Sequence, residues 1–130
     1  MKYILVCFLL LFGHNVISQS RIGFTESEIR KEFYDIKFTV KYSDGSNTRY
    51  IIGQTESTVR YYYFNAEGRC YTCYIKPKNQ GTLNTMVEQY NKMYVIVSDT
   101  EWKMYLEGGG IIRCKLLLLD DEYYFNYEAA

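Results

Sequence analysis

Histidine and proline are nearly absent from the chain: its 130 residues include one histidine, His14, and one proline, Pro77. His14 falls in an N-terminal segment that we expect to be removed. The remaining chain then has no Ser-His or Cys-His nucleophile pair, no histidine general base and no histidine ligand for zinc. The scarcity of proline, beside 15 tyrosines, favours pleated, half-buried strands over disorder.

An excess of charge of either sign is also missing. The chain has 15 basic and 15 acidic residues, and removal of residues 1–18, which include Lys2, leaves 14 basic against 15 acidic residues. A domain this close to neutral has no electrostatic footprint for nucleic acid. We therefore expect no nucleic-acid partner.

The sequence has no apolar run long enough to span a membrane. The run from Tyr3 to Phe12 follows Lys2 and ends at Gly13-His14-Asn15, whereas a spanning helix needs about 20 residues. This order is typical of a signal peptide, so we expect cleavage after residue 18 and export to the periplasm or outside the cell; a buried N-terminal strand is the alternative. Cys7 lies inside the run, so we expect no lipid anchor and, after cleavage, no membrane span.

Residues 19–130 are long enough for one domain with its own core. Thr25 and Glu28 form a capping box, and Phe24 and Ile29 take the positions of a hydrophobic staple, which predicts a helix over about 26–34. A second helix is indicated by apolar residues three and four apart, with Thr85 and Glu88 as a second capping box; these apolar residues are Leu83, Met86, Val87 and Tyr90.

Alternation of apolar and polar residues, interrupted by turn residues, predicts strands over most of the remaining chain. The strand-like runs are 36–42, 49–53, 59–65, 70–76, 94–98, 102–107, 111–119 and 122–127. We therefore expect an α+β fold with two short helices packed on an antiparallel sheet of about seven or eight strands.

Several segments recur about 60 residues apart. Thr25 and Glu28 recur as Thr85 and Glu88, Ile51-Ile52 recurs as Ile111-Ile112, and Tyr62–Asn65 recurs as Tyr123–Asn126. This suggests two tandem repeats of a helix followed by strands, over 22–76 and 82–128. Two alternatives stay open: a register that aligns Arg69-Cys70 with Arg113-Cys114, and coincidence in a tyrosine-rich chain.

The segment Gly23-Phe24-Thr25-Glu26-Ser27-Glu28-Ile29-Arg30 resembles the first-helix motif of small exported SmpA/BamE-like domains and of relatives of the beta-lactamase-inhibitor-protein type. The resemblance implies a helix packed on an antiparallel sheet, in one or two copies, and a function in binding other proteins. It covers about ten residues. The chain lacks both the lipidated cysteine and the Gly-x-Pro that commonly follows the helix, so neither membrane attachment nor partner identity is carried over.

Three cysteines follow the expected signal peptide: Cys70, Cys73 and Cys114. Three thiols are too few for a structural zinc site, and the Cys-x-x-Cys pair lies in a strand-like run rather than at a helix N-terminus, which disfavours redox chemistry. Period-two alternation places Cys73 and Cys114 in the core and Cys70 outside, whereas the repeat register that aligns Arg69-Cys70 with Arg113-Cys114 would favour Cys70 instead of Cys73; we favour the alternation. Either a Cys73–Cys114 disulfide or three free thiols is compatible with this arrangement.

Few other residues suggest chemistry. The acidic run Asp120-Asp121-Glu122 could support a carboxylate hydrolase only inside a cleft, and its place beside a turn favours solvated acids. A carrier of a small apolar ligand would need a cavity between helices and sheet. We expect no catalytic residue, metal site or cofactor.

Large aromatic residues occupy both faces of two predicted strands, 59–65 and 122–127. One face must point away from the core unless the sheet is covered on both sides, and exposed tyrosines suit protein recognition; a core combined with a bias toward tyrosine is the alternative. We therefore expect a non-catalytic binding protein that recognises another envelope or extracellular protein. Its candidate binding residues are Tyr61, Tyr63, Tyr124 and Trp102, although the spacing of Trp102 with Met104 and Leu106 also fits a core.

Overall fold

In the computed structural model, which describes residues 21–130, the first helix begins at the predicted capping box. Helix α2 (Glu26–Glu32) is capped by Thr25. The Glu28 N–H donates to Thr25 Oγ1 at 3.2 Å, and the Thr25 N–H donates to Glu28 Oε1 at 3.0 Å. Both backbone donors at the helix start are thereby satisfied. The predicted signal peptide, residues 1–18, lies outside the described residues.

Helix α3 (Gln80–Met93) begins earlier than predicted. Its N-cap is Asn79, whose Oδ1 accepts a hydrogen bond from the Thr82 N–H at 2.8 Å. Thr85 and Glu88 lie inside the helix and are exposed, so the predicted second capping box is wrong. Asn79 lies in the bend that follows Pro77 and immediately precedes the helix. Asparagine is one of the strongest N-cap residues.

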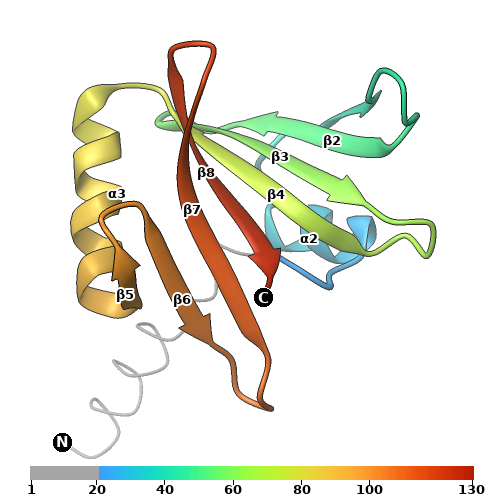
Figure 1. Ribbon diagram of the computed structural model, residues 1–130. Helices are drawn as coiled ribbons and strands as arrows, with labels where there is room; N and C mark the ends of the chain where they lie inside the picture. The colour runs from blue at the N-terminus through green and yellow to red at the C-terminus, as the bar shows by residue number, and fades with distance from the viewer. Residues whose placement is uncertain (1–20) are drawn as a thin grey trace, which may run out of the picture.

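All eight predicted strands are present in one antiparallel sheet, which confirms the α+β class (Figure 1). Their order across the sheet is β1-β2-β3-β4-β8-β7-β6-β5. The strands are β1 (Thr39–Tyr42), β2 (Arg49–Gln54), β3 (Thr58–Phe64), β4 (Cys70–Pro77), β5 (Val95–Ser98), β6 (Glu101–Tyr105), β7 (Ile111–Leu119) and β8 (Glu122–Ala129).

One helix followed by four strands occurs twice along the chain, and the two groups of strands meet where β4 pairs with β8. The recurring sequence segments do not follow this order. Ile51 lies on the second strand of the first group and Ile111 on the third strand of the second group, while Tyr62 and Tyr123 lie on the third and fourth strands of their groups. The similarity at these offsets therefore does not mark structurally equivalent strands.

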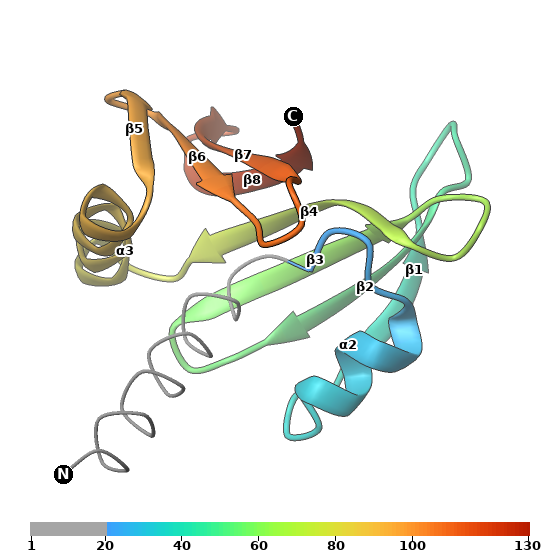
Figure 2. The same cartoon turned by 90° about the horizontal axis from the view of Figure 1, so that it is seen from below.

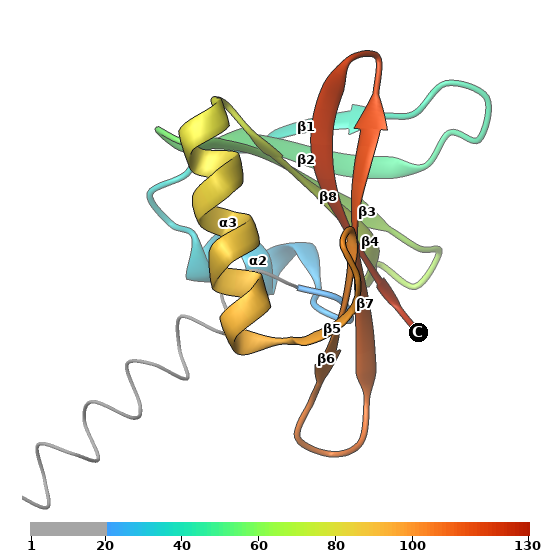
Figure 3. The same cartoon turned by 60° about the vertical axis from the view of Figure 1, so that its left-hand side comes forward.

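The core lies on the face of the sheet that carries the helices (Figure 3). Helix α2 contributes the fully buried Ile29, and α3 contributes Tyr90, whose ring centroid lies 5.0 Å from that of Phe125 on β8. The Tyr90 and Tyr127 hydroxyls hydrogen-bond to each other in the interior. The other large, fully buried side chains include Tyr62, Ile51, Ile75 and Trp102. Within residues 21–130, no helix is long and apolar enough to cross a membrane.

Gly53 on β2 permits close packing of the segment that leads from α2 into β1. A methyl group at this position would lie 2.6 Å from Ile36 Cγ2 and 2.7 Å from Phe38 Cδ1. Those distances are far below van der Waals contact, so any side chain here would displace both neighbours.

We predict that Gly53→Ala lowers the free energy of unfolding by about 1–3 kcal/mol, the usual cost of overpacking. Urea unfolding would measure it. Gly110→Ala is the matched control, because its methyl group would meet only the flexible Leu106 side chain, at 3.3 Å. Both substitutions lower the conformational entropy of the unfolded chain by the same amount. Equal stability of the two variants would contradict the prediction.

Candidate binding surface

Strand alternation places a set of tyrosines on the face of the sheet opposite the helices. On β3, Tyr62 is fully buried in the core, so Tyr61 and Tyr63 point to the other face. The strand register sets Tyr50 opposite Tyr63 and Tyr74 opposite Tyr61. With one residue from β8, this set forms what we call the tyrosine face: Tyr50, Tyr61, Tyr63, Tyr74 and Tyr124.

The five rings form a continuous chain of contacts. Tyr50 stacks on Tyr63 with ring centroids 4.5 Å apart, and Tyr63 meets Tyr74 edge-on at 5.8 Å. Tyr124 contacts Tyr74 at 6.4 Å and Tyr61 at 6.2 Å. Offset and edge-to-face pairs at these distances are the favourable aromatic arrangements, so each ring restrains its neighbours while remaining only half-buried.

The tyrosine face is hollowed into a groove of ≈ 460 Å³. One wall is the turn between β1 and β2, which presents Ser43, Ser46 and Thr48; the other wall includes Leu119 and Asp120 of the β7–β8 hairpin. Ser46 Oγ lies 2.8 Å from Ser43 Oγ and 3.0 Å from Thr48 Oγ1, so hydrogen bonds within the turn hold the first wall. The groove therefore offers aromatic surface and hydroxyl groups together.

Three phenols of this face, those of Tyr63, Tyr74 and Tyr124, are neutral at physiological pH. Burial, followed by the neighbouring tyrosines, raises the pKa of Tyr63 to about 12. Burial also raises the pKa values of Tyr74 and Tyr124. Neutral phenols both donate and accept hydrogen bonds, so the groove can pair with polar groups of either kind.

Charged residues lie at the margin of the tyrosine face and on the other half of the same sheet surface. At the margin, Lys76 Nζ lies 2.8 Å from Glu122 Oε2, and this hydrogen bond lowers the pKa of the Glu122 carboxyl. On β8 and beyond it, the register continues the tyrosine-bearing rows with mixed charges: Glu128 on β8, Arg113 and Lys115 on β7, and Glu101 and Lys103 on β6. The surface is thus aromatic on one half and charged on the other.

The structure brings together three of the four candidate binding residues, Tyr61, Tyr63 and Tyr124. Trp102 is fully buried, and its Nε1–H donates to Asn91 Oδ1 at 2.8 Å, so it belongs to the core and not to this surface. Tyr50 and Tyr74 complete the set but were not among the candidates. Strand parity could have found them, because each lies opposite a candidate tyrosine once the hairpins are paired.

The cysteines differ from the sequence prediction because β4 contains a bulge. Tyr63 pairs with Thr72 and Phe64 with Cys70, which leaves Tyr71 as an extra, 45 % exposed residue. The bulge breaks the period of two, so Cys70 and Cys73 both point into the core, where they are 2 % and 0 % exposed. The prediction that Cys70 lies outside is wrong.

The register also bears on the predicted Cys73–Cys114 disulfide. Both residues pair with Tyr127 on β8, from opposite sides, so about two strand spacings, or about 9.5 Å, separate their backbones. A disulfide needs Cα atoms within about 7 Å, so this register does not support the bridge. All three cysteines are free thiols. Burial raises the pKa values of Cys73 and Cys114, which keeps these thiols unreactive.

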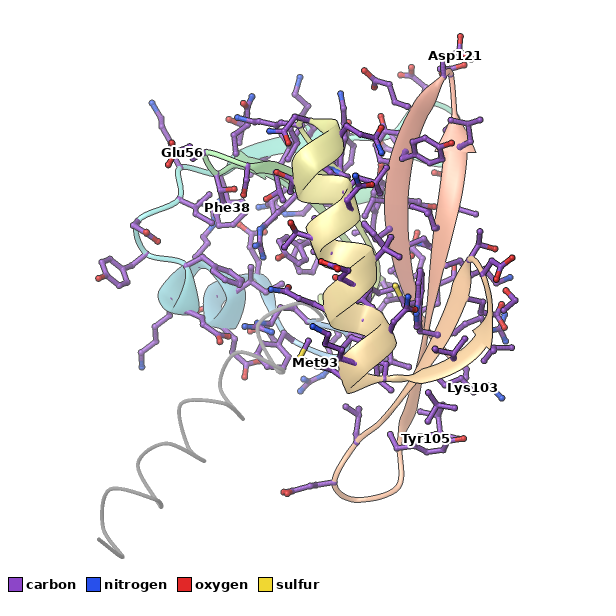
Figure 4. All side chains as sticks on the ribbon, turned by 90° about the vertical axis from the view of Figure 1, so that its left-hand side faces the viewer. Phe38, Glu56, Met93, Lys103, Tyr105 and Asp121 are labelled. Carbon is purple, nitrogen blue, oxygen red and sulfur yellow. The ribbon has the colours of Figure 1, made fainter. Side chains whose placement is uncertain are left out.

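Of the acidic run, Asp120 borders the groove of the tyrosine face, whereas Asp121 and Glu122 do not. Asp120 and Asp121 have φ values of 49° and 64° and form the tip of the β7–β8 hairpin, where Asp121 points away from the rest of the molecule (Figure 4). All three acids are exposed, and Glu122 is paired with Lys76. The groove therefore does not hold the pair of carboxylates that acid–base hydrolysis uses. Residues 21–130 contain no group of three or more His, Cys, Asp or Glu side chains that could hold a metal ion.

A second cavity, of ≈ 290 Å³, lies on the helix side of the sheet. Met93 at the end of α3 and Tyr105 on β6 are among the residues that border it (Figure 4). Its wall is mostly apolar and includes Ile22, Phe24, Met104, Leu106 and Ile112, with Lys103 as its charged member.

Comparison of the chain with protein-family models, with curated proteins and with solved structures gives no match.

We predict that buried tyrosines make the protein labile at high pH. A tyrosine in the unfolded chain ionises near pH 10, whereas Tyr62 and Tyr63 have pKa values of about 12 in the folded protein. The unfolded state then releases protons first, so their stabilising contribution is complete below about pH 10 and is lost as the pH rises toward about 12.

Tyr63→Phe should accordingly show a smaller fall in unfolding free energy over this range than the wild type, measured by urea unfolding at several pH values. Tyr34→Phe is the control, since the Tyr34 ring is 87 % exposed. The same decline in all three proteins would refute the burial of the Tyr63 phenol.

Proposed function

We propose that the protein is an exported, non-catalytic binding protein that recognises another envelope or extracellular protein through the tyrosine face. The observation that carries the proposal is the unbroken contact chain of five rings from Tyr50 to Tyr61 across four strands. Tyrosine provides a large contact area at a low cost in side-chain entropy. Rings already held by their neighbours lose even less freedom on binding.

The surroundings of the tyrosine face favour a protein over a charged ligand. The residues that line the groove include Asp120 and no lysine or arginine, so a phosphate group would find no cation there. The charged half of the surface lies beside the aromatic half, so a partner seated on the tyrosine face would meet a polar border on that side, as at the rim of protein interfaces.

The order of elements also supports the suggested kinship with exported binding domains. The resemblance at residues 23–30 implies a helix packed on an antiparallel sheet in one or two copies, and one helix plus four antiparallel strands occurs twice in this chain. The kinship is a proposal about fold and mode of action, and it assigns no partner.

We predict that replacing Tyr63 and Tyr124 together by alanine weakens binding of the natural partner by at least about tenfold, since central tyrosines are common hot spots. The measurement is affinity capture with tagged protein from its own envelope and medium fractions, followed by titration of the captured protein. Tyr34→Ala removes a ring that is 87 % exposed and lies outside the tyrosine face, and it should bind like the wild type.

Circular dichroism must first show that the double variant is folded. Capture of the same protein with equal affinity by the wild type and the folded double variant would rule out the tyrosine face as the recognition surface.

The apolar cavity favours a second candidate function, the carriage of a small apolar ligand. Its ≈ 290 Å³ lies near the lower limit of ligand pockets. The side chain of Leu106 is 49 % exposed beside the cavity, so it can be changed without disturbing the core.

If the protein is a carrier, we predict that it binds an uncharged fluorescent apolar probe and that Leu106→Lys lowers the affinity at least about tenfold by placing a second charge, beside that of Lys103, in the mostly apolar wall. Leu118→Lys is the control, because Leu118 is 57 % exposed and does not line the cavity. No binding by the wild type, together with a native mass spectrum free of copurified small molecules, would eliminate this function.

A further inference from the structure

Among residues 21–130, strand β5 forms one edge of the sheet and pairs with β6 alone. Figure 2 shows it at the outer end of the row of strands, next to α3. Its sequence is Val95-Ile96-Val97-Ser98, and all four residues are exposed. The three apolar side chains have exposed fractions of 50, 55 and 47 %. Exposed edge strands with apolar side chains are templates for pairing with another strand.

The opposite edge of the sheet is protected in the usual way. Strand β1 contains Lys41, and Lys37 precedes it; both side chains are exposed. Lysines at an edge discourage the approach of another strand because pairing would desolvate them. Strand β5 carries no charge, and the nearest charged residues are Lys92 and Asp99, one on each side. The two edges of the sheet therefore differ in the feature that controls strand addition.

We propose that β5 is a dimerisation edge that pairs antiparallel with β5 of a second copy of this chain about a twofold axis. The segment Val-Ile-Val reads the same in both directions, so antiparallel pairing centred on Ile96 sets Ile96 opposite Ile96 and Val95 opposite Val97. The pairing joins like apolar side chains, and an irregularity of β5 against β6 between Ile96 and Ser98 takes Val97 out of strict alternation with Val95. Such a self-complementary contact is what a twofold dimer requires.

Charge at the ends of the strand fits the same arrangement. Antiparallel pairing brings the turn at Asp99 of one copy toward the end of α3 of the other, where Lys92 is the basic residue of the last turn. An acidic and a basic residue therefore lie near each other at both ends of the paired strands. With only four residues in each edge strand, the interface belongs to the small, weak class, so dimer formation depends on concentration.

Sedimentation equilibrium of the protein purified from the compartment in which it accumulates tests the proposal. We expect a dimer fraction that rises with concentration in the micromolar range, and a dimer constant weakened at least about tenfold by Ile96→Lys. Leu118→Lys is the control, since Leu118 is similarly exposed but lies on the far β7–β8 hairpin, and it should dimerise like the wild type.

Disulfide trapping tests the register. Residues opposite each other in an antiparallel pair have Cα atoms within disulfide range, so Ile96→Cys should form a covalent dimer under mild oxidation much faster than Ser98→Cys, which would face Tyr94. A monomer at all concentrations, a dimer insensitive to Ile96→Lys, or equal trapping at both positions would overturn the proposal. So would a monomer that instead binds a strand of another protein through Ile96.

Discussion

The pairing of β4 with β8 is the constraint on which the rest of the sheet depends, because it is the one junction between the two groups of four strands. Asn126 on β8 fixes this junction: its Nδ2–H donates to Thr72 Oγ1 at 2.8 Å and to the Cys73 carbonyl at 3.3 Å. The resulting register places Tyr124 against Tyr61 and Tyr74 on one face and Phe125 beneath Tyr90 on the other. A slip by one residue would exchange the two faces of β8.

Local sequence rules predicted which segments form helices and strands. They gave a wrong helix start and a wrong side-chain orientation where a second local feature competed with the first. Alternation and turn residues located all eight strands, and the Thr25 capping box located α2. The start of α3 was missed because two capping sites lie close together and Asn79 is used. The burial of Cys70 was missed because one extra residue, Tyr71, shifts the strand parity. A bulge leaves no distinct mark in the residue pattern, so it becomes visible only when the partner strand is known.

The candidate surface was predictable in kind but not in extent. The two strand-like runs with aromatic residues on both faces, 59–65 and 122–127, predicted that some rings point outward. Three of the five tyrosines of this face, Tyr61, Tyr63 and Tyr124, were candidates from the sequence. Tyr50 and Tyr74 belong to it only because of pairing between strands, and Tyr124 reaches Tyr61 only because β8 returns across the sheet to lie beside β4. The groove over these rings depends on two hairpins from different groups of strands, which is non-local information that a residue pattern does not contain.

The proposed dimerisation edge, β5, and the tyrosine face lie on different parts of the same sheet, and this arrangement has a consequence for binding. A twofold axis at β5 stands perpendicular to the sheet, so it keeps the faces of the two copies aligned, and both tyrosine faces would lie on the same side of one continuous sheet. The tyrosine face spans β2 to β8, away from β5, so dimerisation would leave it uncovered. A dimer of this kind presents two identical sites in fixed orientation. Even a weak dimer could then bind a repetitive or oligomeric partner more tightly than one site does, because the second contact forms at a high effective concentration.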